Sequence, residues 1–160
     1  MNKEPLRTQI MERLTADLAT LFRAARTAHE AATHEECLPD NKYDTTALEA
    51  SYIAQGQANR AQEIRQALES YRTLSLQDFD DNTPIRLTAL IDLEDDDGNR
   101  RTVFLGPEGG GLRLTVDGLE VTVVTPASPL GRSLLGKGVD DEVDVSTDSC
   151  TRSFHILAIR

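Results

Sequence analysis

The 160-residue chain contains no tryptophan, and aromatic residues make up only 4% of it. Any single hydrophobic core is therefore modest, although the length suffices for one ordinary domain or two small ones. The two cysteines, Cys37 and Cys150, are too far apart to form a paired metal or redox motif. No apolar run resembles a signal peptide or reaches the length of a membrane span, so we expect a cytoplasmic protein without membrane contacts.

The chain also lacks an excess of basic residues. It has 17 Lys and Arg against 27 Asp and Glu, which gives a net charge of −10 and a pI of about 4.7. Binding to DNA by phosphate neutralisation needs a basic face, so we expect no direct DNA binding. Proteins with basic surfaces, or metal ions, fit this charge better as partners.

The first half has a single glycine, Gly56, and reads as two long helices. Apolar residues recur at steps of three and four, the spacing of one helix face, in residues 5–34 and again in 45–74. A short turn between them predicts an antiparallel hairpin. Alanines dominate both stripes near the turn and larger residues dominate away from it, so we expect the helices to approach closely at the turn end. An alanine-rich hairpin is equally typical of an oligomerisation element.

The turn between the helices carries four carboxylates. They belong to Glu35, Glu36, Asp40 and Asp44. Pro39 cannot continue a helix, and Asp40 is a residue type that opens one. Composition alone is compatible with an ordinary solvated loop.

The second half changes to the alternating pattern of β-strands. We expect strands at 85–91, 101–105, 112–114, 119–124, 142–146 and 154–159, forming an antiparallel sheet. One short helix is expected at 128–136, with Ser128 as N-cap, Pro129 at the first position and Gly136 just past the end. The prediction is an α+β protein with a helical hairpin over 1–78 and a β domain over 79–160.

Residues 125–137, followed by Asp140-Asp141-Glu142-Val143, resemble the signature of the bacterial Gre transcript cleavage factors. That signature reads Ser-Pro, a small residue or Gly-Arg, Leu-Leu/Ile-Gly-Lys, then an acidic pair and a valine-rich strand. In the first half, the run from Asp40 to Tyr43 resembles the acidic-Asn-x-x-Tyr opening of the family's second helix. The resemblance covers most of the chain, in the family's order of hairpin and then sheet.

The resemblance implies an FKBP-like C-terminal domain that docks on RNA polymerase at the rim of its secondary channel. The docking residues would be Ser128, Pro129, Leu130, Gly131 and Arg132. The coiled coil would reach down the channel toward the active centre, in indirect contact with nascent RNA. Such a protein is an accessory factor to transcription elongation rather than an enzyme.

In the cleaving members of the family, an acidic pair at the tip helps to hold a second Mg²⁺ ion shared with the polymerase. Carried onto this chain, the catalytic acids would be Asp40 with Glu36 or Glu35, and the metal ligands Asp40 and Glu36. Carboxylates are hard oxygen ligands suited to Mg²⁺.

The tip departs from the family pattern of an acid, two intervening residues and then Glu-Asn. When Asp40-Asn41 is matched to Glu-Asn, Cys37 occupies the position of the acid. The alternatives are therefore a factor that stimulates cleavage, with Glu36 substituting for the missing acid, and a non-cleaving regulator of the same channel. A third is an FKBP-like isomerase or chaperone module, which the scarcity of aromatic residues in the second half disfavours. The thiol of Cys37 would be a metal ligand, a redox-sensitive group or an incidental small side chain.

Overall fold

A computed structural model describes the backbone of residues 1–36 and 45–160, and the side chains of residues 1–31 and 53–160. The chain divides into two compact units, which we call the sheet unit (Met1–Met11 with Ser70–Arg160) and the hairpin unit (Glu12–Glu69). The predicted α+β class, with a helical hairpin followed by a sheet that carries a short helix, is confirmed. The expected domain boundary at residues 78/79 stays a prediction.

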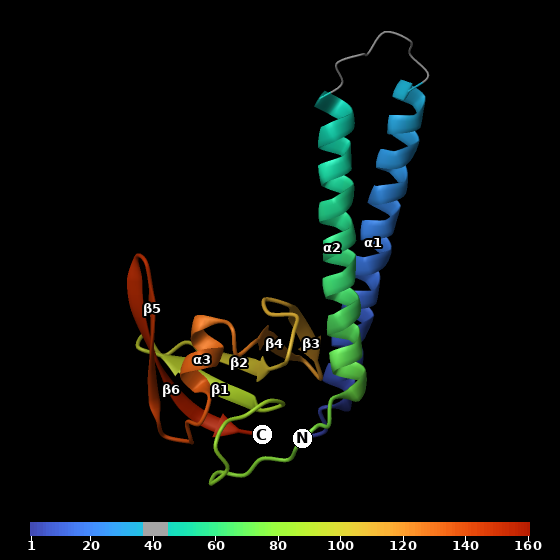
Figure 1. Cartoon of the computed structure of the whole chain (residues 1–160). Helices are drawn as coiled ribbons and strands as arrows, with labels where there is room; N and C mark the ends of the chain where they lie inside the picture. The colour runs from blue at the N-terminus through green and yellow to red at the C-terminus, as the bar shows by residue number, and fades with distance from the viewer. Residues whose placement is uncertain (37–44) are drawn as a thin grey trace. The chain divides into compact units, whose positions relative to one another are not determined.

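The elements follow one another along the chain as Figure 1 shows. They are α1 (Glu4–Glu36), α2 (Thr45–Thr73), β1 (Leu90–Asp95), β2 (Arg100–Leu105), β3 (Arg113–Val116), β4 (Leu119–Val124), α3 (Pro129–Leu134), β5 (Glu142–Thr147) and β6 (Cys150–Ile159). Among the residues that the structure describes, none of the helices combines the length and the apolar composition of a membrane-spanning segment.

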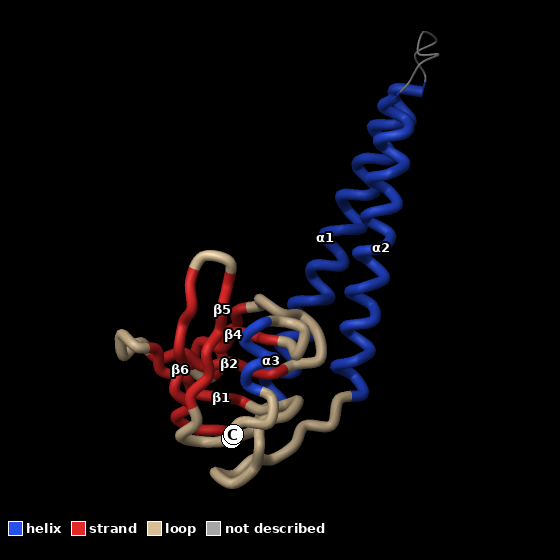
Figure 2. Tube along the Cα trace, turned by 60° about the vertical axis from the view of Figure 1, so that its left-hand side comes forward, coloured by secondary structure: helices blue, strands red, loops and turns tan. Residues whose placement is uncertain are grey.

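The six strands form one sheet in the order β3-β4-β2-β1-β6-β5 (Figure 2 shows them in red). Neighbouring strands are antiparallel except β2 and β4, which pair in parallel from Thr102↔Val121 to Leu105↔Val124. The expectation of a wholly antiparallel sheet is therefore wrong for this pair. The chain reverses once between β2 and β3 and again at Asp117-Gly118, where both φ angles are positive, so β4 runs in the direction of β2.

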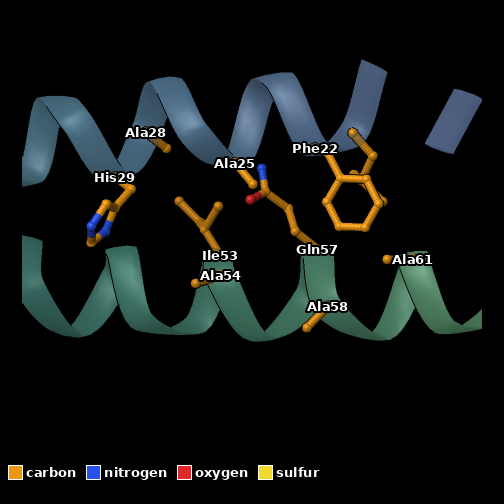
Figure 3. Close-up of a pocket in the computed structure, with 10 residues that line it drawn as sticks. Phe22, Ala25, Ala28, His29, Ile53, Ala54, Gln57, Ala58 and Ala61 are labelled. Atoms are coloured by element: carbon orange, nitrogen blue, oxygen red, sulfur yellow. The ribbon is translucent and has the colours of Figure 1, made fainter. Parts of the chain in front are cut away.

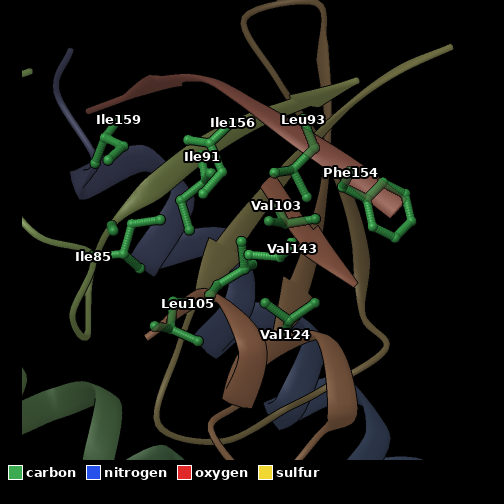
Figure 4. Packing of buried hydrophobic residues seen from close by; sticks show 12 residues of the cluster. Ile85, Ile91, Leu93, Val103, Leu105, Val124, Val143, Phe154, Ile156 and Ile159 are labelled. Carbon is green, nitrogen blue, oxygen red and sulfur yellow. The ribbon is translucent and has the colours of Figure 1, made fainter. Parts of the chain in front are cut away.

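The sheet buries apolar side chains on both faces. In β1, Ile91 and Leu93 point into a cluster shared by β2, β5, β6 and α3 (Figure 4). Leu90 and its partner Phe104 alternate with these residues, are fully buried and lie outside that cluster. Tyr71 is also fully buried next to the sheet, since a Cβ added at Gly106 would lie 2.2 Å from its hydroxyl oxygen. The last turn of α2 therefore belongs to the core of the sheet unit.

The strand expected at 85–91 begins only at Leu90. Thr88 adopts a φ of 76°, a left-handed conformation that ends any extended run before it. Two contacts from outside the segment hold it there: the Thr88 hydroxyl accepts a hydrogen bond from the Gln77 N–H at 3.0 Å, and the Thr88 N–H donates to the Leu105 carbonyl at 2.8 Å. Alternation of apolar residues carries no information about such tertiary hydrogen bonds. The alternation therefore predicted a strand that begins too early.

Lys3 is buried in the sheet unit and joins segments that are far apart in the sequence. Its ammonium group donates to the carbonyls of Thr88 at 2.9 Å and Arg160 at 3.2 Å, and also to that of Gln77. Burial lowers the pKa of this lysine, and the nearby carboxylate of Asp78 opposes the shift. A buried ammonium is tolerated because carbonyl oxygens replace its lost water.

The hairpin unit departs from the close packing expected near the turn. Leu14, Ala61 and Ile64 are buried, whereas Ala28 and Ala54, further along the same stripes, are exposed. Between the helices there lies a groove of about 340 Å³. Figure 3 shows the reason: Phe22, Ile53 and Gln57 point between the helices and take up space that alanines alone would have left for closer approach.

Replacing Lys3 with Met should destabilise the sheet unit by about 1–3 kcal/mol, because the Thr88 carbonyl is left buried without a donor. Urea unfolding followed by circular dichroism measures the change. The exposed Lys137 provides the control, and its replacement with Met should alter stability by less than about 0.5 kcal/mol. Equal effects of the two substitutions would contradict the structural role given to Lys3.

Tyr71 should make the sheet unit sensitive to alkaline pH. Burial and the Glu108 carboxylate raise its pKa above the ordinary 10.0, while the unfolded chain loses this proton at the ordinary value. The folded state then binds more protons above about pH 10, so stability falls as the pH rises through that range. Replacing Tyr71 with Phe should remove this part of the decline and, at neutral pH, cost about 1 kcal/mol for the lost 2.7 Å hydrogen bond to the Glu108 carbonyl. Parallel stability curves of the two proteins between about pH 8 and pH 11 would contradict this assignment.

Candidate functional site

The five residues expected to dock on a partner lie together in one tight turn at the start of α3. The Ser128 hydroxyl accepts a hydrogen bond from the Gly131 N–H at 3.1 Å and donates one to the Thr125 carbonyl at 2.8 Å. It therefore fixes the first turn of the helix to the end of β4. The predicted roles of Ser128 as N-cap, Pro129 in the first turn and Gly136, with a φ of 78°, just past the end are confirmed.

Gly131 is required by a close approach between α3 and the preceding chain. A Cβ at this position would lie 1.9 Å from the Thr125 carbonyl oxygen and 3.0 Å from the Ser128 hydroxyl oxygen. No side chain fits such a gap, so any other residue must displace the helix from the end of β4. The glycine of the Ser-Pro-Leu-Gly-Arg run therefore sets the shape of the turn.

The turn presents only part of the predicted set to solvent. Pro129 and Arg132 are exposed, Ser128 and Leu130 are half-buried, and Gly131 is buried. Ser128 and Gly131 thus build the surface, while the side chains of Pro129 and Arg132 and one side of Leu130 are accessible on it.

Leu135 is an accessible residue that the sequence prediction did not include. It is 39% exposed, while the preceding Leu134 is fully buried in the core cluster. Leu135 is the C-cap of α3 and has left the helical conformation, with φ −55° and ψ 128°, so its side chain does not follow Leu134 into the core. The adjacent leucines at the end of the expected helix were the available signal for an apolar surface residue here.

The acidic pair that follows α3 shapes a loop. The Asp141 carboxylate accepts a hydrogen bond from the Gly138 N–H at 2.7 Å, and the Asp141 carbonyl accepts one from the Ile156 N–H at 2.9 Å. Asp140 adopts a φ of 68°, and its carboxylate lies 3.7 Å from Nε2 of His155. Both acidic residues of the motif therefore have a local structural role in this loop.

The predicted catalytic and metal-binding acids fall at the turn of the hairpin. Glu35 and Glu36 are the last residues of α1, and their side chains lie outside the described residues, as does Asp40 entirely. The described part of the chain contains no group of three or more His, Cys, Asp or Glu residues that could hold a metal ion. The roles of Asp40, Glu36 and Glu35 with Mg²⁺ therefore stay predictions.

A family model, "Transcription elongation factor, GreA/GreB, C-term", matches residues 80–160, which include the whole α3 turn and all six strands. The chain belongs to the GreA/GreB family. This family consists of transcription elongation factors, which act as accessory factors in transcription. Membership in the family implies RNA polymerase as the partner. A search of curated proteins finds no match to this GreA/GreB member.

Solved structures similar to this GreA/GreB protein include several transcription factors. A structure of the transcription factor Gfh1 is 24% identical, with 94% of this chain and 92% of that chain covered and a TM-score of 0.40. The GreA factor homolog 1 (Gfh1) protein of Thermus thermophilus is 21% identical over 94% of each chain, with a TM-score of 0.38. The transcription elongation factor GreA/GreB from Nitrosomonas europaea is 13% identical, covers 60% of this chain and 78% of its own, and has a TM-score of 0.37.

Replacing Gly131 with Ala should displace α3 and destabilise the sheet unit by about 3 kcal/mol, because the new methyl group overlaps the Thr125 carbonyl. Replacing Ser128 with Ala should cost about 1 kcal/mol through loss of the N-cap. Gly56 in α2 has nothing within 4 Å of an added Cβ, so its replacement with Ala should instead stabilise the protein by about 0.5–1 kcal/mol. Thermal unfolding measures all three, and a harmless Gly131 substitution would contradict the close approach.

Proposed function

We propose that this protein binds RNA polymerase through the surface around α3 and inserts its helical hairpin into the secondary channel. The observation that carries the proposal is the α3 turn, in which Ser128 and Gly131 build a rigid surface that presents Pro129 and Arg132. This turn lies inside the region that matches the elongation-factor family. A surface fixed by packing and hydrogen bonds binds with little loss of conformational entropy.

We further propose that the tip of the hairpin stimulates transcript cleavage by the polymerase. Asp40, with Glu36 or Glu35, would supply carboxylate oxygens to a Mg²⁺ ion shared with the polymerase. The ion would stabilise the charge that develops as a water molecule attacks the RNA backbone. The chemistry remains that of the polymerase, and the protein supplies ligands and position.

A second candidate function is that of a non-cleaving regulator that occupies the same channel. Cys37 favours it, because this residue stands three positions before Asp40, where the cleaving members of the family carry an acid. A thiol is a softer ligand than a carboxylate and suits Mg²⁺ poorly. Binding to polymerase without shortening of transcripts would distinguish this function from the first.

An isomerase function finds no support in the sheet unit. Phe104 and Phe154, the aromatic residues of the six strands, are both buried. The pocket next to α3 is lined by a single aromatic ring, that of Phe154, among the described side chains. Prolyl-peptide pockets are lined mainly by hydrophobic and aromatic groups, whereas two arginines line this one.

Transcript cleavage in backtracked elongation complexes tests the proposal. The wild-type protein should bind core polymerase and shorten the transcripts, whereas Asp40→Asn should bind within about twofold and cleave at least about tenfold more slowly, since one metal ligand is lost. Glu12→Gln, on an exposed position of α1, is the matched control and should behave as wild type.

Two other outcomes of these binding and cleavage assays would change the assigned function. A wild-type protein that binds polymerase and leaves transcripts intact would replace cleavage stimulation with the regulatory function. A wild-type protein that does not bind polymerase at all would refute both.

A further inference from the structure

A pocket of about 400 Å³ lies between α3 and the β5–β6 hairpin. Its lining includes Arg101, Leu130, Val145, Cys150, Arg152 and Phe154. All of these residues belong to the sheet unit. Leu130 also belongs to the run of residues expected to dock on polymerase, so the pocket is continuous with that surface.

The inner side of the pocket is apolar and rigid. Phe154 is 4% exposed and belongs to the core cluster, at the edge of the residues drawn in Figure 4. Leu130 and Val145 pack against the same cluster. Because these side chains are held by the core, the pocket needs little rearrangement to accept an apolar group.

Two arginines line the same pocket. Arg101 pairs with Leu93 across the sheet and so shares the core face, and its guanidinium lies 4.7 Å from the centre of the Phe154 ring. Arg152 lies on β6, in the register position opposite Val145. Neither arginine forms a close ion pair with a carboxylate among the side chains that the structure describes, although the charge of Arg101 also acts on the carboxylate of Asp95. In a chain with a net charge of −10, two such guanidinium groups make a distinct positive site.

The exposed thiol of Cys150 reports on this positive site. Its pKa is lowered, first by a hydrogen bond between its sulfur and Oγ1 of Thr147, which lie 3.6 Å apart, and then by Arg152. A lowered thiol pKa means faster alkylation, since the thiolate is the reactive form. The cysteine therefore provides a chemical probe of whether the pocket is open or covered.

We propose that this pocket, which we call the arginine pocket, receives a segment of RNA polymerase that carries a carboxylate next to an aliphatic side chain. The aliphatic group would pack on Leu130 and Phe154, and the carboxylate would bind the guanidinium groups of Arg101 and Arg152. Guanidinium groups bind carboxylates with two parallel hydrogen bonds, and the apolar inner side has no polar group that would suit a fully hydrated anion. The inference rests on the proposed function and extends the docking surface beyond the residues of the α3 turn.

Charge reversal of the pocket tests the inference. The double variant Arg101→Glu/Arg152→Glu should bind core polymerase at least about tenfold more weakly than wild type, and the difference should shrink as salt is raised. The control is Arg86→Glu/Arg113→Glu, which makes the same change of net charge at two exposed arginines that do not line the pocket. It should bind within about threefold of wild type, and circular dichroism should show both variants folded.

Alkylation of Cys150 gives an independent readout. In a Cys37→Ser background, saturating core polymerase should slow the reaction of Cys150 with iodoacetamide at least about tenfold, because the partner covers the thiol. GTP alone, at millimolar concentration, should leave the rate unchanged; protection by GTP would show a phosphate site and overturn the assignment to a protein partner.

The assignment stands only if charge reversal weakens binding and polymerase protects Cys150. Wild-type binding that is indifferent to charge reversal, or that leaves Cys150 reactive, overturns the arginine pocket and leaves the proposed function intact. If the wild-type protein does not bind polymerase, the proposed function fails and the pocket's assignment fails with it.

Discussion

The sheet unit depends on the hydrogen bonds that the ammonium group of Lys3 donates. Its hydrogen bonds to the carbonyls of Thr88 and Arg160 join the residue before α1 to a turn before β1 and to the residue that follows β6. The Tyr71 hydroxyl adds a second link, from the end of α2 to the loop between β2 and β3. Burying these polar groups is tolerable only because each donor meets an acceptor. The unit that carries the candidate docking surface is thus assembled from both ends of the sequence.

Helix periodicity and end signals located the two long helices and α3. Ser128, Pro129 and Gly136 are local signals, because a cap or a left-handed residue acts on neighbours within one turn. They therefore placed α3 within about a residue of its position in the structure. The apolar periodicity over residues 5–34 likewise placed the start of α1 within one residue of Glu4.

Other features depend on contacts between distant segments and could not be inferred from the pattern. The late start of the strand expected at 85–91 results from hydrogen bonds that Thr88 makes with Gln77 and Lys3. The parallel pairing of β2 with β4 depends on how two successive reversals place the strands, which alternation does not encode. The groove between the helices follows from side-chain size at Phe22 and Ile53, which lay off the alanine stripes. The motif located the docking residues, but only the packing shows that Ser128 and Gly131 shape the turn while Pro129 and Arg132 are accessible.

The place of β6 in the sheet has a consequence for how the protein is made. This strand lies between β1 and β5 in the sheet. Its residue Ile159 pairs with Ile91 of β1, so β6 and β1 are neighbours although most of the β domain's sequence lies between them. The hairpins β1–β2 and β3–β4 close through local contacts, and such contacts form first. During synthesis, therefore, the edge of β1 that pairs with β6, and the whole of β5, have no partner strand until residues 150–159 leave the ribosome. The sheet is completed in a late step, when β6 pairs with β1 and β5. The nascent chain is most prone to incorrect strand pairing just before that step.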